Sequence, residues 1–161
     1  ITGQDAGRLA AAGRELGAIT HLADVRRTNE LDALAASAKS HFGRLDILFA
    51  NAGVAYATPL AETNGEHFDE LFDINVKGVF FTVQSLAPLM PAGASIVLNT
   101  SWLDQVGTPG LSVLSATKAA VRSLTRTLAD SRQDRHEPGG AGGIRHAVDA
   151  ANPAEALWRS R

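Results

Sequence analysis

The sequence has no cysteine among its 161 residues and contains one tyrosine, one methionine and two tryptophans. The absence of cysteine excludes disulfides, thiolate catalysis and cysteine metal ligands, and it is consistent with a cytoplasmic location. No apolar run approaches the roughly 20 residues of a membrane-spanning helix, and no signal-peptide pattern is present. We therefore expect neither a membrane partner nor a secreted, disulfide-bonded fold.

The chain also lacks a charge excess of either sign. Its 15 basic and 17 acidic residues give a formal net charge of −2, so no electrostatic argument favours nucleic acid as a partner. The histidines have no metal-ligand spacing, so no metal site is expected; they are His21, His41, His67, His136 and His146. With 45% hydrophobic and 20% charged residues, the composition is typical of one globular domain.

Apolar periodicity alternates between helix and strand along the first 130 residues. This alternation predicts an α/β fold with a parallel sheet covered on both faces. Thr28 and the Thr63/Glu66 pair have the spacing of helix caps, and the run at 45–51 is typical of a strand buried on both faces. The expected helices cover 5–16, 28–42, 64–90 and 112–129, and the expected strands cover 18–25, 45–51 and 94–99.

The last part of the chain has a different composition. Residues 131–161 are rich in charge and glycine, and 131–143 are expected to form a loop. A short strand could follow within 143–148. The predicted organisation is therefore one partial domain at 1–130 and a divergent tail at 131–161.

Candidate functional residues lie at the predicted carboxyl ends of strands and in the helices that follow. Ser101 is followed thirteen residues later by Leu114, and four later by Lys118 (114 − 101 = 13; 118 − 114 = 4). Upstream, the sequence contains, in order, Asp24-Val25, Asn51-Ala52-Gly53 and Asn75. Taken singly, each has an ordinary structural explanation as a turn, a strand end or a surface position.

Together these motifs resemble those of classical short-chain dehydrogenases/reductases over roughly residues 1–130. The resemblance implies a doubly wound Rossmann-like sheet and hydride transfer between NAD or NADP and an alcohol or carbonyl. It implies that Ser101 binds the substrate oxygen, that Lys118 holds the nicotinamide ribose, and that Asn75 serves a proton relay. It further implies that Asp24-Val25 and Asn51-Ala52-Gly53 border the cofactor.

Two departures from the family pattern bear on activity. The family's catalytic tyrosine position holds Leu114, which has no proton to donate to a carbonyl oxygen. Tyr56 is the single tyrosine, and nothing in the sequence places it over Lys118. The family's glycine-rich TGxxxGxG loop has no counterpart, and Thr2-Gly3 aligns better with the end of the family's second strand. On that alignment the first strand, the loop and the first helix are absent.

A missing first strand has a structural consequence. In the order 3-2-1-4-5-6 the first strand separates strand 2 from strand 4. Without it, two sheet edges are exposed, and we expect low cooperativity or association. Thr2-Gly3-Gln4 offers neither a carboxylate for the ribose of NAD nor an arginine for the phosphate of NADP.

Three functional interpretations remain open from the sequence. The first is an NAD(P)(H)-dependent oxidoreductase that is impaired or inactive as this chain. The second is a non-catalytic subunit-interaction protein, because the family's common tetramer interface corresponds to helices 64–90 and 112–129. The same helices would also permit a homo-oligomer. The third is a truncated gene product without a function of its own.

Overall fold

The protein is described by a computed structural model that covers residues 1–130 and 147–149. Strands and helices alternate along this part of the chain, as the sequence predicts. The strands are β1 (Thr2–Gly3), β2 (His21–Leu22), β3 (Ile47–Ala50), β4 (Ser95–Leu98) and β5 (Ala147–Asp149). The α-helices are α1 (Ala6–Leu16), α2 (Thr28–Phe42), α3 (Gly65–Phe72), α4 (Val79–Leu86) and α5 (Ser112–Asp130).

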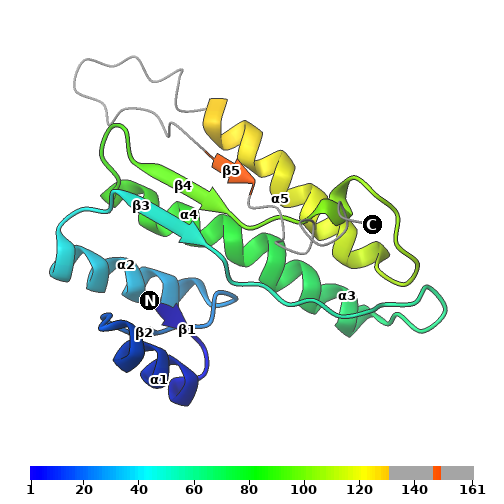
Figure 1. Ribbon diagram of the computed structural model, residues 1–161, viewed down its shortest axis with the longest axis horizontal. Helices are drawn as coiled ribbons and strands as arrows, with labels where there is room; N and C mark the ends of the chain where they lie inside the picture. The colour runs from blue at the N-terminus through cyan, green and yellow to red at the C-terminus, as the bar shows by residue number, and fades with distance from the viewer. Residues whose placement is uncertain (131–146, 150–161) are drawn as a thin grey trace, which may run out of the picture.

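The described strands form two separate parallel sheets. One sheet pairs β1 with β2, and the other has the order β3-β4-β5. Figure 1 shows β1, β2 and α1 at the lower left and the larger sheet above them. No strand within residues 1–130 or 147–149 joins β1 to β3. The expected break in an incomplete Rossmann-like sheet is confirmed.

The main core lies between the larger sheet and helices α4 and α5. It is built from alternate residues of β3 and β4, such as Leu48 and Ile96, and from one face of α4, including Val83 and Leu86. Val121 of α5 closes this core and is completely buried. In the N-terminal part, the buried apolar residues are Ala23 and Leu31. The core therefore stabilises the second half of the chain far more than the first.

Strand β3 differs from its expected environment. Leu48 and Ala50 are buried, but Ile47 is 70% exposed and Phe49 is 54% exposed. The prediction of burial on both faces is wrong here, because no described element covers the face of β3 that lies opposite α4. The apolar run of β3 is therefore buried on one face only.

The long predicted helix at 64–90 is divided in the structure. A π-helical turn (Asp73–Gly78) separates α3 from α4, and a short 3₁₀ turn (Ala87–Leu89) ends the segment. Such π turns insert an extra residue into an α-helix and occur frequently at functional sites. Periodicity could not reveal the turn because apolar residues recur on both sides of it.

Two predicted caps are displaced by one residue. Asn64 rather than Thr63 caps α3, and its side chain accepts from the His67 amide at 2.9 Å. Thr28 is the first residue of α2, whose N-cap is Arg27. The expected end of the first helix at residue 16 is confirmed, because Gly17 follows with a left-handed φ of 60° that ends α1 without the strain that a Cβ would introduce.

The predictions for the C-terminal segment are tested only in part. Residues 147–148, within the expected short strand, lie in β5, which the structure pairs in parallel with β4. The expected loop at 131–143 and the residues 144–146 lie outside the described part of the chain. A search of the described residues finds no helix that is both long and apolar enough to span a membrane.

Candidate active site

The carboxyl ends of β3 and β4 bring three of the site's polar side chains together. Asn51 follows β3 and accepts a 2.7 Å hydrogen bond from the side-chain amide of Asn99, which follows β4. The Asn99 carbonyl accepts from Lys118 Nζ at 3.1 Å. Lys118 projects from α5, and its burial lowers the pKa of the ammonium group. The arrangement fixes one amine at the end of the sheet.

Asn75 lies in the π turn and is almost completely buried. Its Oδ1 accepts from the Val54 amide at 2.8 Å, and its Nδ2 donates to the Val54 carbonyl at 2.9 Å. The same Nδ2 lies 3.2 Å from the hydroxyl of Thr117. Asn75 thus fixes the loop after β3 to the turn and to α5.

Gly53 permits this close approach. A Cβ at this position would lie 3.1 Å from Asn75 Oδ1 and 3.8 Å from Lys118 Nζ. The structure therefore brings Asn51, Gly53, Asn75 and Lys118 into one cluster, while Ala52 lies exposed in the loop between them.

Ser101 lies at the end of the β4 segment and caps a 3₁₀ turn (Trp102–Asp104). Its side chain is buried, and Oγ accepts from the Leu103 amide at 3.3 Å. The 3₁₀ turn is joined to α5 by an ion pair between Arg122 and the buried carboxylate of Asp104. This ion pair fixes the segment carrying Ser101 relative to the helix carrying Lys118.

Leu114 belongs to a small apolar cluster rather than to a polar site. It is 5% exposed and clusters with Leu71 and Val113, with Val54 and Tyr56 packed against them. Its carbonyl accepts from the hydroxyl of Thr117 at 2.7 Å. The first turn of α5 therefore presents a hydrocarbon group one helical turn before Lys118.

Tyr56 does not replace the missing acid in this geometry. Its hydroxyl donates to Glu70 Oε2 at 2.8 Å and lies 3.1 Å from the His67 carbonyl. Desolvation and the hydrogen bond to Glu70 raise the pKa of Tyr56 to about 12. With this pKa and these partners, the Tyr56 phenol stays neutral and is hydrogen-bonded to residues of α3. No hydrogen bond joins it to Lys118.

Asp24 and Val25 lie after β2 and line the same cavity as Asn51, Ala52 and Gly53. The Asp24 carboxylate is bound to Arg26, with Nη2 and Oδ2 2.6 Å apart, and this contact lowers the pKa of Asp24. The Asp24 amide donates to Glu30 Oε2 at 2.7 Å. Val25 packs against Gly78, where a Cβ would lie 2.7 Å from Val25 Cγ2.

The described residues do not form a complete dinucleotide site. Lys118 and the asparagines offer donors suited to a ribose, but a pyrophosphate is normally bound by the amides at a helix N-terminus. At α1 the Asp5 carboxylate already accepts from the Arg8 amide at 2.8 Å, and its negative charge opposes a phosphate. The residues present thus fit one half of the cofactor and not the other.

Two contributors were missed by the sequence reasoning. Thr117 is completely buried and bridges Asn75 to the Leu114 carbonyl, and Asn99 joins Asn51 to Lys118. A threonine in the middle of an otherwise apolar helix face was the available signal for Thr117. The described residues hold no group of three or more potential metal-ligating side chains.

Comparisons with known proteins agree with this arrangement. A family model described as enoyl-(acyl carrier protein) reductase matches residues 1–136. Oxidoreductase asL5 from Sarocladium schorii is 44% identical over 120 residues, which cover 73% of this chain and 46% of that protein. The diacetyl reductase of Staphylococcus epidermidis is 34% identical over 121 residues, or 73% of this chain and 47% of that protein.

Solved structures extend the likeness to three dimensions. A short-chain dehydrogenase/reductase from Burkholderia phymatum in complex with NAD has a TM-score of 0.81 and 30% identity, covering 99% of this chain and 59% of its own. One from Brucella melitensis has a TM-score of 0.78 and 30% identity, covering 81% and 57%. The chain belongs to the short-chain dehydrogenase/reductase family. It spans about half the length of the curated relatives it matches.

Proposed function

We propose that this chain carries the site of an NAD(P)(H)-dependent oxidoreductase that interconverts an alcohol and a carbonyl, and that its activity is impaired or absent as this chain stands. Ser101, Asn75 and Lys118 supply hydrogen bonds for a substrate oxygen, for the β3 loop and for a ribose, respectively. The single observation that carries the proposal is the burial of Leu114 in an apolar cluster at the position of the family's acid.

The missing acid predicts a specific kinetic defect. Loss of a positioned general acid commonly costs a factor of ~10²–10⁴ in rate. We expect the 161-residue chain to oxidise neither NADH nor NADPH measurably with diacetyl, the substrate class named for one relative. Fluorescence titration of either cofactor should give weak or no binding, and a micromolar dissociation constant would contradict this part of the proposal.

Substitution of Leu114 separates the effect of the missing acid from the effect of the incomplete cofactor site. Leu114→Tyr should restore no activity in the chain alone, because the pyrophosphate has no described binding loop. A chimera would join a relative's amino-terminal strand, glycine loop and helix to this chain, and would replace the tail with a relative's carboxyl-terminal segment. In this chimera, Leu114→Tyr should raise carbonyl reduction. Lys118→Ala should then remove the gain. If the chimera reduces carbonyls equally well with Leu114 and with tyrosine, the acid assignment is wrong.

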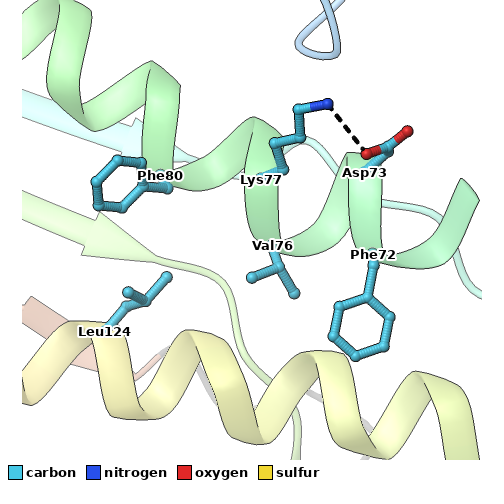
Figure 2. Close-up of a pocket in the computed structure, with 6 residues that line it drawn as sticks. All are labelled: Phe72, Asp73, Val76, Lys77, Phe80 and Leu124. Atoms are coloured by element: carbon cyan, nitrogen blue, oxygen red, sulfur yellow. Dashed lines mark hydrogen bonds and ion pairs between the residues drawn. The ribbon is translucent and has the colours of Figure 1, made fainter. Parts of the chain in front are cut away.

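A second candidate function, subunit interaction, is favoured by an apolar surface over α3, α4 and α5. Phe68 is 44% exposed and Phe80 is 36% exposed. A shallow pocket of about 390 Å³ lies beside them and is lined by Phe72, Asp73, Val76, Lys77, Phe80 and Leu124. Figure 2 shows Phe72 and Val76 pointing toward α5, with the Lys77–Asp73 ion pair on the other side of the helix.

This surface supports self-association or association with a family member through α3–α5. Phe80→Glu should lower the association constant measured by sedimentation at least tenfold. Phe42→Glu provides a matched control, since Phe42 is 56% exposed but lies on α2. If the chain is monomeric, does not bind a relative and does not bind cofactor, the remaining interpretation is a gene product without a function of its own.

A further inference from the structure

The amine of Lys118 has surroundings that binding of a ribose alone does not account for. Its Nζ donates to the main-chain carbonyl of Asn99 at 3.1 Å, in a part-buried position. Among the side chains that the structure describes, no carboxylate forms an ion pair with Lys118. Its hydrogen-bond partner is therefore a neutral oxygen, which does not require the side chain to be an ammonium ion.

The groups next to this amine are also uncharged. The side-chain amides of Asn51 and Asn99 are joined at 2.7 Å, and a Cβ at Gly53 would lie 3.8 Å from Lys118 Nζ. One helical turn before Lys118, Leu114 is buried in its apolar cluster. Burial among such groups penalises the charged form and lowers the pKa of the Lys118 ammonium. The neutral amine, which is the nucleophilic form, is therefore favoured at this position.

The same amine is accessible from solvent. The side chain of Lys118 is only partly buried, and Asn51 and Gly53 lie exposed just after β3. Because residue 53 is a glycine, it has no side chain to cover Nζ. A small molecule can therefore approach the amine over the exposed loop after β3.

The chain contains two other lysines, which provide an internal comparison. Lys39 lies exposed near the end of α2. Lys77 is also exposed, and its Nζ pairs with Asp73 Oδ1 at 3.3 Å. Lys118 is thus the most buried of the three, and access alone would make it the slowest to react.

We propose that Lys118 is a covalent site for small, uncharged aldehydes and ketones, which its neutral amine binds as an imine. A desolvated lysine amine is a typical nucleophile toward carbonyl carbon. A charged compound would find no opposite charge among the neutral groups around Nζ. The reaction requires no nicotinamide cofactor, so it goes beyond the proposed hydride transfer and does not depend on it.

The step is a condensation in which nothing is oxidised or reduced. The nitrogen lone pair attacks the carbonyl carbon and forms a C–N bond, while the electrons of the carbonyl π bond move to the oxygen. One nitrogen proton passes through solvent to that oxygen and gives a carbinolamine. The oxygen then leaves as water with the second nitrogen proton, and the C=N bond forms. Water is the only by-product, and no further reactant is needed.

The test exposes the folded 161-residue chain to pentanal and sodium cyanoborohydride at neutral pH. The reductant converts each imine into a stable secondary amine, so peptide mapping by mass spectrometry measures the pentyl group at every lysine. Lys118 should be modified on the order of tenfold faster than Lys39 and Lys77, although it is the most buried. The N-terminal amine, which donates to the Ile19 carbonyl at 2.7 Å, is quantified separately in the same map.

Labelling in urea is the matched control, because unfolding exposes all three lysines to the same solvent. The three lysines should then react at similar rates, since the carbonyl of Asn99 and the apolar cluster no longer surround Lys118. Equal rates in the folded chain, or slower modification of Lys118 than of Lys39, would overturn the proposal. A preference for Lys118 that persists in urea would also overturn it, because the fold would then not be the cause.

A substitution gives an independent check. Lys118→Arg keeps a donor for the Asn99 carbonyl but has no amine that condenses with pentanal, so the fast phase of incorporation should disappear. Lys39→Arg is the matched control and should leave that phase unchanged. A fast phase that survives in Lys118→Arg would contradict the proposal, and if this variant unfolds, the comparison of folded and urea-unfolded unsubstituted chain decides the question. Cofactor titration tests the proposed function separately, because labelling by pentanal requires no cofactor.

Discussion

The N-terminal part, from β1 to α2, and the C-terminal part, from β3 to β5, are built from the same alternation of strand and helix, yet they differ in what they bury. The first pairs two strands of two residues each and buries Ala23 and Leu31. The second buries a continuous apolar core between β3, β4, α4 and α5. The difference shows that secondary structure follows local pattern, whereas a core requires neighbouring strands on both sides.

The two parts meet mainly through α2, whose Leu34, Ala35 and Ala38 pack against the main core. In addition, Gly78 lies against Val25, and the Ser85 hydroxyl donates to Asp32 Oδ1 at 3.2 Å. Because the segment from β1 to β2 contributes no residue to the main core, we expect it to open at a lower free energy than the C-terminal part. The following predictions test this comparison.

The largest expected contrast is between a core leucine of the C-terminal part and a partly exposed leucine of the N-terminal part. Leu98→Ala should lower the free energy of unfolding by about 2–5 kcal/mol, because Leu98 is 1% exposed in the main core. Leu9 on α1 is partly exposed, so Leu9→Ala should lower the free energy of the main unfolding transition by about 1 kcal/mol or less. Urea denaturation followed by circular dichroism measures both. Equal losses would show that the two parts unfold as one unit.

The Asn75 contacts should be the next most sensitive feature of the C-terminal part. Asn75→Ala leaves the Val54 amide and carbonyl without their partners in a part-buried position, which should cost about 1–3 kcal/mol. Asn64→Ala, which removes an exposed helix cap, is the control and should cost about 1 kcal/mol. If the two variants lose the same stability, Asn75 has no special structural role.

The junction between the two parts can be tested at Gly78. Gly78→Ala places a Cβ 2.7 Å from Val25 Cγ2, and such overpacking costs about 1–3 kcal/mol. Adding Val25→Ala to Gly78→Ala should partly restore the free energy of unfolding. As a control, Gly65→Ala should be nearly neutral, because its Cβ would meet nothing within 4 Å. Hydrogen exchange in α1 and β2 should accelerate in Gly78→Ala. An absence of rescue would mean that the contact does not couple the two parts.

The smallest expected effect concerns Tyr56, whose titration is unambiguous in a chain with one tyrosine. Its pKa is raised from 10 to about 12, so the folded state favours the protonated phenol. The stabilisation is therefore complete below pH 10 and is lost as the pH rises from 10 to 12. Tyr56→Phe should cost about 1 kcal/mol at neutral pH. Ultraviolet absorbance should show a lower midpoint in Glu70→Gln, and an unchanged midpoint would exclude Glu70 as a cause.

The sequence predicted the order of elements because apolar spacing records which face of each helix and strand is buried. It also predicted the break between β1 and β3, since the glycine-rich loop has no counterpart in the sequence. It missed the π turn and the exposed face of β3, because a local apolar run does not reveal whether a neighbour covers it. Asn75 was singled out in advance, but its partners Val54 and Thr117 depend on tertiary packing.

The burial of Leu114 changes what this position contributes to the protein. Ionisable groups at active sites are held at some cost to stability, and replacing them commonly trades function for a more stable fold. Here an apolar side chain fills that position and packs with Leu71 and Val113. Introducing a phenol would therefore require room and a hydrogen-bond partner inside a hydrocarbon cluster. Recovery of catalysis at this position thus depends on how far Leu71 and Val113 move to admit a phenol, as well as on the restored hydroxyl.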